Sequence, residues 1–519
     1  MVRLFDYVDK AAFHWPNNPS ITFQGQTFSW KQTRERCRAF AAKLHELGVR
    51  PGDRVAYLGL NSHQCFEGYF APSLIGAAFV PINVRLAVGE VVEVVEDCRP
   101  KVLIADQAHM EAARQVTAQC DCITTLISCG AGNLEPGEIS YEDGLAENTP
   151  EVDFDALGSR GDDTIIIFYT GGTTGKPKGV ELSHANNFTN AIGSASAYTL
   201  GMQENHLLSG PMFHAAAGSR VFSATILAGH TVIMPKFDTE EMMRLIPQYQ
   251  INIAQIVPTM IMMILNHPSL ATADWSSLRL MTYGASPIPE GTLRRALKEM
   301  PNCSFAQAFG MTEASPVLTI LSPEYHTLEG PLTGKLGSVG KPVAHVDVRV
   351  VGEDGSPVHA GEIGEIIARG PNMARGYLGN PEQTAAAFRN GWYHTGDSGY
   401  LDEDGFLFVV GRIKDMIISG GENIYPIEVE NLLSRHPAVM ESAIIGVPDD
   451  HWGETVHAVV VLKEGQSATK QDLITFCRDQ IAHYKCPSSI SFMTGRLPLT
   501  PINKIDKLAL RKIYSCKGT

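Results

Sequence analysis

The feature that most constrains the fold is the alternation of short apolar runs with helical patterns along the first half of the chain. The runs are rich in Val, Ile, Leu and Phe and end at turn residues: Val55–Leu60, Ala77–Ile82, Lys101–Ala105, Ile123–Ile127, Thr164–Tyr169, Thr231–Met234 and Leu280–Tyr283. Strands that alternate with helices favour parallel sheets covered by helices on both faces. Thr239, followed by Glu240 and Glu241, predicts the start of one such helix. The sequence therefore predicts an α/β fold with doubly wound sheets.

From about Ser338 the pattern changes to short strands joined by tight turns. Asp354-Gly355 and Asp404-Gly405 are dipeptides typical of hairpin turns, and apolar residues alternate on both sides of them. This part of the chain predicts a β-barrel-like subdomain attached to the large N-terminal domain.

After Gly411 the pattern becomes mixed again. It predicts, in order, a helix, two strands and a second helix: Pro426–Arg435, Ser442–Val447, His457–Leu462 and Lys470–Ala482. This stretch is long enough for a small α+β domain. We therefore predict two domains, an N-terminal domain at 1–411 and a C-terminal domain at 412–519.

Composition excludes several classes of protein. The 519 residues include 42 Lys and Arg against 56 Asp and Glu, a net charge of −14, so a nucleic acid is not the expected partner. With 44% hydrophobic and 19% charged residues, the chain has the composition of a packed globular protein. The longest uncharged run, Gly68 to Val84, is broken by Pro72 and Pro81, which predicts buried core and no transmembrane segment.

The N-terminus and the cysteines indicate a compartment. The first fifteen residues carry acidic side chains among the apolar ones, unlike a secretory signal. The ten cysteines show neither the density of a disulfide scaffold nor paired metal-ligand spacing. We therefore predict a cytoplasmic protein, and the sequence leaves open a peripheral contact with a membrane and a homodimer.

The strongest local motif is the segment YTGGTTGKPKG at 169–179. It follows a buried strand and precedes a segment able to start a helix, an arrangement that holds phosphates. Thr170, Thr173 and Thr174 offer hydroxyl donors and Lys178 offers a positive charge. Backbone N–H groups can approach phosphate oxygens closely at Gly171, Gly172 and Gly175. The motif is not a Walker loop, because Pro177 follows Lys176 where that loop needs Ser or Thr.

This segment resembles the signature of the adenylate-forming superfamily, which includes acyl-CoA synthetases, firefly luciferase and nonribosomal peptide adenylation domains. Five further stretches match the family in its order: YGASP at 283–287, FGMTE at 309–313, YHTGD at 393–397, GRIKDMIISGGENIYP at 411–426 and LPLTPINK at 497–504. The resemblance implies a ligase that uses ATP, Mg²⁺ and coenzyme A.

The resemblance assigns the nucleotide site. It implies that adenine lies between Gly284-Ala285 and the ring of Phe309, where the family usually has tyrosine, with Gly310 beside it. It also implies that Asp397 accepts hydrogen bonds from both ribose hydroxyls and that Arg412 assists.

The resemblance likewise assigns the phosphate and metal site. Thr312 and Glu313 would face the α-phosphate, with Glu313 holding Mg²⁺ directly or through water. Lys504 would be the adenylation lysine, bridging the carboxylate of the acid and the α-phosphate. Two positions depart mildly from the family: Asn503 stands where glycine is common, and Gly171 where serine is frequent.

The acid is indicated by the segment around His214, which follows a predicted strand at Leu207–Gly210. In the family this position faces the carboxylate in acyl ligases, whereas amino-acid-activating relatives commonly carry aspartate. Ala216 and Ala217 are small, whereas related aryl ligases often have a bulky aromatic residue at the position of Ala216. We therefore predict a medium-chain or long-chain fatty acid, with an aryl or ring-containing acid, including a steroid acid, as the alternative.

The last part of the resemblance concerns the second half-reaction, in which a thiol displaces AMP from acyl-AMP. It implies that the C-terminal domain rotates about Lys414 and brings Gly420 and Gly421 to a pantetheine tunnel, with Lys485 as the remaining local basic residue for CoA. Because little sequence follows Lys504, free CoA is the expected acceptor. A stand-alone enzyme that loads a separate carrier protein, or a luciferase-like oxygenase, is the second interpretation. A nucleotide sensor without a product is disfavoured by the presence of both Lys504 and Glu313.

Overall fold

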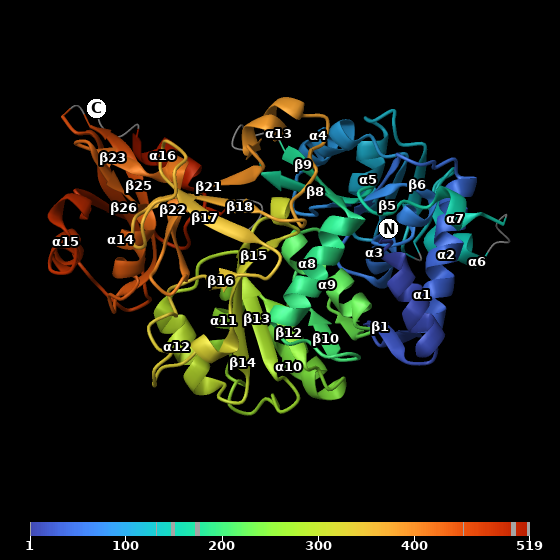
Figure 1. The fold of residues 1–519 in the computed structure, drawn as a ribbon, viewed down its shortest axis with the longest axis horizontal. Coiled ribbons are helices and arrows are strands. Elements are labelled where there is room, and N and C mark those ends of the chain that lie inside the picture. The colour runs from blue at the N-terminus through green and yellow to red at the C-terminus, as the bar shows by residue number, and fades with distance from the viewer. Residues whose placement is uncertain are drawn as a thin grey trace. The chain divides into compact units, whose positions relative to one another are not determined.

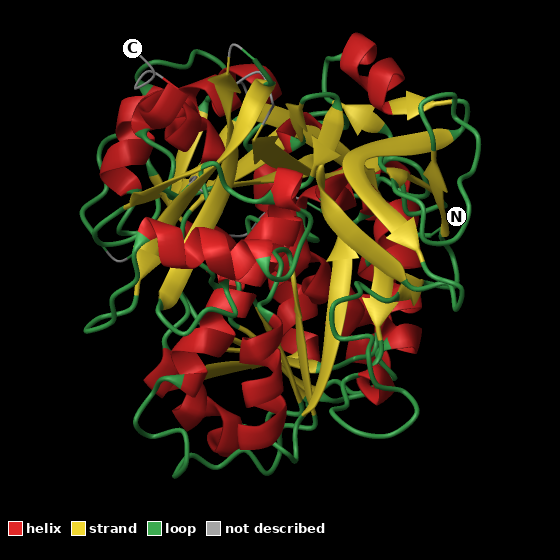
Figure 2. Ribbon diagram, turned by 90° about the vertical axis from the view of Figure 1, so that its left-hand side faces the viewer, coloured by secondary structure: helices red, strands yellow, loops and turns green. Residues whose placement is uncertain are grey.

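The computed structural model describes residues 2–130, 132–146, 151–171, 177–449, 451–499 and 505–515. The chain divides into two compact units. The first comprises Met1–Pro287, Arg295–Val348 and Ala368–Tyr393, and the second comprises Ile288–Arg294, Arg349–Ile367 and His394–Thr519. Helices and strands occur throughout both units (Figure 2). The domain boundary between residues 411 and 412 stays a prediction.

A nine-stranded sheet runs through the first unit in the order β16-β15-β14-β13-β12-β10-β11-β1-β2. Its strands are β1 (Pro19–Phe23), β2 (Gln26–Ser29), β10 (Asn205–Leu208), β11 (His230–Ile233), β12 (Ile253–Ile256), β13 (Leu280–Gly284), β14 (Ser304–Gly310), β15 (Val317–Leu321) and β16 (Lys341–Pro342). The strands from β11 to β14 run parallel, as expected for a doubly wound sheet. The N-terminal strand β1 joins them in parallel, with Ile21 opposite Thr231.

The second sheet of the first unit has eight strands in the order β19-β9-β8-β4-β3-β5-β6-β7. They are β3 (Arg54–Leu58), β4 (Ala78–Ile82), β5 (Val102–Ala105), β6 (Thr125–Ser128), β7 (Ile139–Ser140), β8 (Thr164–Gly171), β9 (Pro177–Ser183) and β19 (Gly376–Tyr377). Every residue of β4 and β5 is buried, which explains their continuous apolar sequence. The predicted α/β class with two such sheets is confirmed.

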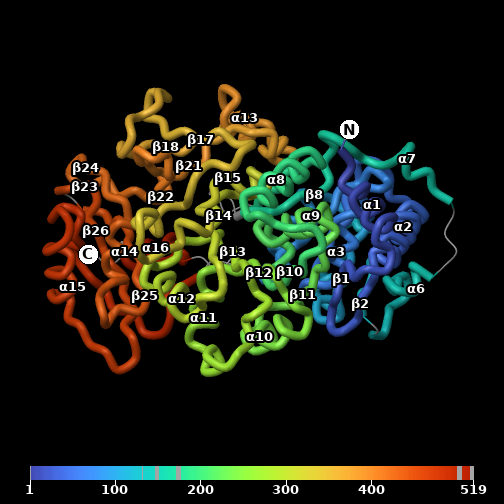
Figure 3. The backbone as a smooth tube through the Cα atoms, turned by 60° about the horizontal axis from the view of Figure 1, so that its bottom comes forward, coloured from blue at the N-terminus to red at the C-terminus, as the bar shows by residue number. Residues whose placement is uncertain are grey.

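Helices flank these sheets in the first unit. They are α1 (Phe5–His14), α2 (Trp30–Glu46), α3 (His63–Gly68), α4 (Val88–Cys98), α5 (Met110–Thr117), α6 (Tyr141–Ala146), α7 (Phe154–Leu157), α8 (His184–Ala197), α9 (Ala215–Ile226), α10 (Thr239–Gln248), α11 (Pro258–Leu265), α13 (Pro381–Ala387) and the single turns η1 (Pro72–Ile75), η2 (Thr312–Ala314) and η3 (Pro323–Tyr325), while α12 (Glu290–Glu299) belongs partly to each unit. Figures 1 and 3 show α1 packed beside α2. Helix α10 is capped by Asp238, which accepts from the Glu241 N–H at 2.8 Å, one residue before the predicted start at Thr239.

Apart from β19, the strands that follow residue 346 form two five-stranded sheets. One contains β17 (Asp347–Val351), β18 (Gly364–Arg369), β20 (Phe388–Arg389), β21 (Trp392–Leu401) and β22 (Leu407–Arg412); the other contains β23 (Ile417–Ser419), β24 (Glu422–Ile424), β25 (Val439–Asp449), β26 (Gly453–Leu462) and β27 (Ser489–Phe492). The helices here are α14 (Pro426–Leu433), α15 (Lys470–Arg478), α16 (Lys507–Ser515) and the turns η4 (Ile413–Asp415) and η5 (His483–Lys485). The predicted turn at Asp404-Gly405 joins β21 to β22, and Gly405 has φ +78°.

The core of the first unit contains the uncharged run from Gly68 to Val84. Phe70, Leu74 and Phe79 in this run are fully buried and pack with α2 and α9 residues such as Phe40 and Phe222. The run is therefore core, as predicted. In the described part of the chain, no helix is both long and apolar enough to cross a membrane.

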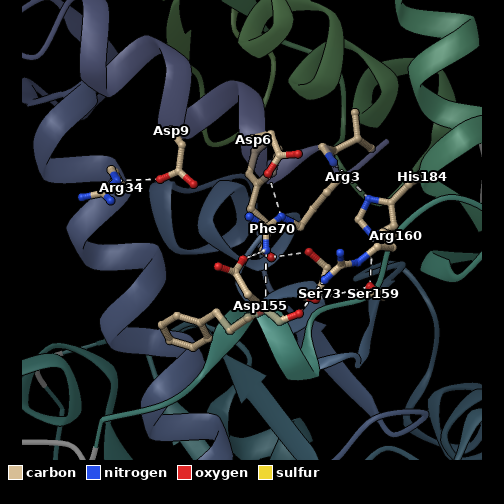
Figure 4. Close-up of polar contacts among 12 residues, drawn as sticks. Arg3, Asp6, Asp9, Arg34, Phe70, Ser73, Asp155, Ser159, Arg160 and His184 are labelled. Atoms are coloured by element: carbon tan, nitrogen blue, oxygen red, sulfur yellow. Dashed lines mark hydrogen bonds and ion pairs between the residues drawn. The ribbon is translucent and has the colours of Figure 1, made fainter. Parts of the chain in front are cut away.

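His184, at the start of α8, is a buried polar link in this unit (Figure 4). Its Nδ1 accepts from the backbone N–H of Leu4 at 3.1 Å, so Nε2 carries the proton and donates to the Ser159 hydroxyl at 2.9 Å. Ser159 in turn donates to the carbonyl of Ser73 at 3.3 Å. Burial lowers the pKa of His184 to about 4, because the charged imidazolium is poorly solvated there.

We expect this histidine to make the protein less stable in mild acid. Its pKa lies below the ordinary value of 6.5, so the unfolded chain binds the proton first as the pH falls. The free energy of unfolding should therefore fall by up to about 3 kcal/mol between pH 6.5 and pH 4 on account of His184 alone. Urea unfolding across this range, compared with His184→Gln, measures the effect: the variant should be less stable at pH 7 and lose less on acidification. An equal loss in both proteins would contradict the assignment.

Candidate active site

The glycine-rich segment lies at the tip of a β-hairpin. Strands β8 and β9 are antiparallel, with Thr170 opposite Lys178 and Gly171 opposite Pro177. The strand expected before the motif is β8, and the helix expected after it is α8, whose N-cap is Ser183. The sequence did not predict β9, which lies between the loop and α8. The helix N-terminus therefore does not directly follow the loop. Four predicted phosphate-loop residues lie outside the described residues: Gly172, Thr173, Thr174 and Gly175.

Glu313 lies in η2, immediately after β14. It is 9% exposed, and its Oε1 accepts a hydrogen bond of 2.8 Å from the hydroxyl of Tyr377 in β19. The amine of Lys178 lies 5.1 Å from the centre of the same tyrosine ring. Tyr377 therefore links the carboxylate of Glu313 to the base of the glycine-rich hairpin. Sequence reasoning missed Tyr377, since its stretch of sequence carries no recognised motif.

The residues near Glu313 fit a magnesium ion held together with substrate phosphates. Mg²⁺ is typically bound by one or two carboxylates plus phosphate and water oxygens. Glu313 is such a carboxylate, and Tyr377 orients it. In the ranges that the structure describes, no group of three or more His, Cys, Asp or Glu side chains could form an all-protein metal site.

The predicted adenine residues come together at the ends of two neighbouring parallel strands. Gly284 ends β13 and lies opposite Ala308, next to Phe309 in β14. A Cβ at Gly284 would come within 2.3 Å of the Ala308 carbonyl oxygen, so strand packing alone already requires glycine there. Ala285 has φ +66°, which turns the chain sharply away from the strand.

Gly310 is also required by backbone packing. A Cβ at this position would lie 1.8 Å from the carbonyl oxygen of Pro316, which accepts from the Met311 N–H at 2.9 Å. This close approach folds the segment back on itself and carries Thr312 and Glu313 beyond the end of β14. The FGMTE motif is therefore a tight backbone turn as well as a set of side chains.

In the second unit, Asp397 and Arg412 form a fixed pair. They are opposite each other on β21 and β22, and Arg412 Nε lies 2.8 Å from Asp397 Oδ1. Arg412 Nη1 also donates to the Thr395 carbonyl at 3.1 Å, and the Asp397 N–H donates to the Thr395 hydroxyl at 3.0 Å. Asp397 is only 6% exposed, so its carboxylate is held in one orientation.

The predicted hinge and CoA residues also lie in the second unit. Lys414 is exposed in η4, directly after β22. Gly420 and Gly421 form the two-residue turn between β23 and β24, with φ +60° and +87°. A Cβ at Gly420 would approach the ring of Trp452 to 2.7 Å, a close packing that the sequence did not indicate.

Lys485 is already paired. Its amine lies 2.9 Å from both carboxylate oxygens of Glu428 in α14. The positive charge that sequence reasoning assigned to CoA is therefore partly neutralised by a neighbour from another element. A role for Lys485 in CoA binding stays a prediction.

The residues predicted to bind the acid lie around the start of α9. His214 is its N-cap residue and contacts Phe213, their rings 4.7 Å apart. Ala217 is 4% exposed and belongs to the main apolar core. Ala216 is only partly buried, and its carbonyl accepts a 2.5 Å hydrogen bond from Gln255 Nε2 on β12. Of the two alanines, Ala216 is thus the better placed to line a pocket.

Lys504 and Asn503 lie outside the described residues. The roles assigned to them, and to the other residues of the site, stay predictions.

Comparison with known proteins agrees with the motifs. The AMP-binding enzyme family matches residues 8–378, and the AMP-binding enzyme C-terminal domain matches residues 428–504. Feruloyl-CoA synthase of Amycolatopsis sp is 39% identical over 500 residues, 96% of each chain. Long-chain-fatty-acid–CoA ligase FadD13 of Mycobacterium tuberculosis is 34% identical over 91% of this chain and 90% of its own.

A solved structure is similar over nearly the whole chain. O-succinylbenzoate coenzyme A synthetase of Bacillus subtilis, in complex with ATP and magnesium ion, superimposes with a TM-score of 0.84 at 29% identity and covers 98% of each chain.

Proposed function

Since this chain belongs to the AMP-binding enzyme family and is an adenylate-forming acid–CoA ligase, we propose that its acid is aromatic or ring-containing. Enzymes of this family use ATP with Mg²⁺ and CoA. A carboxylic acid and ATP give acyl-AMP and pyrophosphate, and the CoA thiol then displaces AMP to give acyl-CoA. The first step supplies the leaving group that the second step needs.

The observation that carries the proposal is the polar sheet face beneath α9. Gln255 of β12 and Thr282 of β13 are register partners, and both side chains bond to α9, Gln255 at the Ala216 carbonyl and Thr282 at Arg220 Nη2. A long alkyl chain along this face would desolvate polar groups without satisfying them. A compact acid with polar substituents suits it better. The medium-chain or long-chain fatty acid predicted above is therefore less well supported than its ring-containing alternative.

The substrates for which the relatives are named also favour a ring-containing acid. The feruloyl-CoA synthase is 39% identical to this chain, whereas the fatty-acid ligase is 34% identical. The enzyme in the solved structure is named for o-succinylbenzoate, an acid that contains a ring. A bulky aromatic residue at the position of Ala216, often found in aryl ligases, is absent here. The pocket would then be wider than in those enzymes.

The site residues have distinct proposed roles. His214 would face the reacting carboxylate from the start of α9, where small neighbours leave space. The glycine-rich hairpin would hold the phosphates, and Glu313, oriented by Tyr377, would hold Mg²⁺, which neutralises phosphate charge when bound. Asp397 would accept from the ribose hydroxyls, since Arg412 already fixes its orientation. Lys504 would stabilise the charge that develops between carboxylate and α-phosphate.

A pyrophosphate-release assay tests the proposed acid. Wild-type enzyme with ATP and Mg²⁺ is supplied separately with cinnamic, phenylacetic, octanoic, palmitic and cholic acids, with and without CoA. The proposal expects the highest kcat/KM with a ring-containing acid and CoA-dependent release of AMP. A preference for palmitic acid would overturn it. Pyrophosphate release without CoA-dependent AMP release would instead indicate a separate carrier protein as the acceptor.

Replacing Ala216 with tryptophan should narrow the pocket. We expect kcat/KM to fall at least about tenfold for ring-containing and long acids, and much less for propionate, because pocket volume discriminates by ~1–3 kcal/mol per methylene-sized group. Steady-state pyrophosphate release measures kcat/KM for each acid. Ala271→Trp, at an exposed position, is the matched control. A uniform loss across all acids would show that Ala216 does not line the acyl pocket.

A further inference from the structure

Four polar residues gather where α9 contacts strands β12 and β13. We call Tyr198, Arg220, Gln255 and Thr282 the distal polar cluster. Arg220 comes from α9, Gln255 and Thr282 from β12 and β13, and Tyr198 from the end of α8. These elements neighbour one another in the first unit (Figure 1).

Sheet register fixes where the cluster lies. Gln255 and Thr282 are directly opposite each other, so their side chains point to the same face of the sheet. Gly284 lies two residues further along β13, about 7 Å toward the carboxyl edge and on the same face. Ligands of open α/β sheets bind at that edge. The cluster therefore lies one step below the expected adenylate site.

Arg220 is a partly buried cation in the cluster. Its Nη2 donates to the Thr282 hydroxyl at 3.2 Å, and its guanidinium carbon lies 4.5 Å from the centre of the Tyr198 ring. Its Nη1 is buried and has no hydrogen-bond partner among the described residues. No described carboxylate pairs with it either, although buried charges are normally paired.

Gln255 presents the complementary group. Its Nε2 donates to the Ala216 carbonyl, which can only accept, so the orientation of the amide is determined. Its Oε1 is then directed elsewhere, buried and without a partner in the described part of the chain. The hydroxyl of Tyr198 is likewise buried, and it faces the guanidinium of Arg220. The cluster thus contains a strong donor and an acceptor, both unsatisfied.

We propose that the distal polar cluster recognises a hydroxyl group at the end of the acid remote from its carboxylate. This inference rests on the proposed function. A hydroxyl oxygen accepts from Arg220 Nη1 while its hydrogen is donated to Gln255 Oε1. A second carboxylate would be repelled by Gln255 Oε1, and a methyl group would leave both atoms unpaired. The expected substrate class is a phenolic acid.

The spacing along α9 agrees with such a substrate. His214, proposed to face the reacting carboxylate, and Arg220 are six positions apart, a distance of about 9 Å along the helix axis. Ala216 lies between them and leaves space. A phenyl ring joined to the carboxylate by a two-carbon chain, with a hydroxyl opposite that chain, spans a comparable length.

Paired acids that differ by one hydroxyl test the proposal. Pyrophosphate release is measured with 4-hydroxycinnamic and cinnamic acid, and with 8-hydroxyoctanoic and octanoic acid. Wild-type enzyme should prefer the hydroxylated member. Arg220→Met should lower kcat/KM for that member about 10- to 100-fold, the worth of a hydrogen bond to a charged group, and leave the other nearly unchanged. Arg244→Met, an exposed arginine paired with Glu241, is the control and should change neither.

A second variant guards against misfolding. Thr282→Val keeps the shape but removes the hydroxyl that positions Arg220, so it should reduce the same preference to a smaller extent. Equal losses for both members of a pair, or a wild-type enzyme indifferent to the hydroxyl, would overturn the proposal. If the enzyme activated only octanoic and 8-hydroxyoctanoic acid, the proposal of a ring-containing substrate would be wrong. The preference between these two acids would still test whether the distal polar cluster recognises a hydroxyl group.

Discussion

Replacing Lys504 with alanine is expected to abolish acyl-AMP formation while leaving thioester formation from supplied acyl-AMP largely intact. The lysine charge would stabilise the transition state only when carboxylate and α-phosphate react. Losing one such preorganised group lowers the rate by about 10²–10³. Single-turnover assays of the two half-reactions, one starting from acid and ATP and the other from acyl-AMP and CoA, measure the two rates separately.

Lys512→Ala provides the matched control, because Lys512 is an exposed lysine on α16 close in sequence. It should leave both half-reactions at the wild-type rate. An equal loss of both half-reactions in Lys504→Ala would contradict a role confined to adenylation. It would also remove the reason for a rotation of the C-terminal domain about Lys414.

Replacing Arg36 with alanine is expected to destabilise the protein by about 3–5 kcal/mol. The Glu67 side chain is 0% exposed, and Arg36 Nε lies 2.5 Å from its Oε1. The hydroxyl of Tyr141 donates to Glu67 Oε2 at 2.6 Å. Without Arg36, this carboxylate would stay buried with a hydrogen bond but no counter-charge. Urea unfolding at pH 7 measures the loss.

Arg34→Ala is the comparison, since Arg34 lies on the same helix but pairs with Asp9 at the surface (Figure 4). Asp9 is also contacted by Arg38, and an exposed ion pair contributes about 0–1 kcal/mol. The double variant Arg36→Met with Glu67→Leu should recover part of the stability, because it removes both buried charges. A loss of less than 1 kcal/mol in Arg36→Ala would show that Glu67 is adequately stabilised by Tyr141 alone.

Strand positions and the family motifs could be predicted from the sequence because both depend on neighbours along the chain. The predicted run at 55–60 became β3, and that at 77–82 became β4, since a strand buried on both faces needs an unbroken apolar sequence. The FGMTE stretch was recognisable for a similar reason, because its glycine serves a local backbone turn.

Strand β9, between the glycine-rich loop and α8, was not predicted for the opposite reason: its structure does not depend on neighbours along the chain. The residues at 177–183 have enough alternation for a strand, but what makes them one is pairing with β8 and with Tyr377 of β19. A short segment of this kind takes its structure from its partners. The pattern of these seven residues alone could not have decided whether they form a strand or continue the loop.

By itself the sequence determined the fold class and the family, and it predicted which groups would handle ATP. Only the tertiary structure decided which side chains meet. Tyr377 reaches Glu313, and Arg220 reaches Thr282, from segments about 60 residues apart. Glu67 meets both Arg36 and Tyr141 from distant segments in the same way. Polar groups are paired across such distances because burial makes an unsatisfied group costly, and the partner that satisfies it is chosen by the packing of helices and sheets.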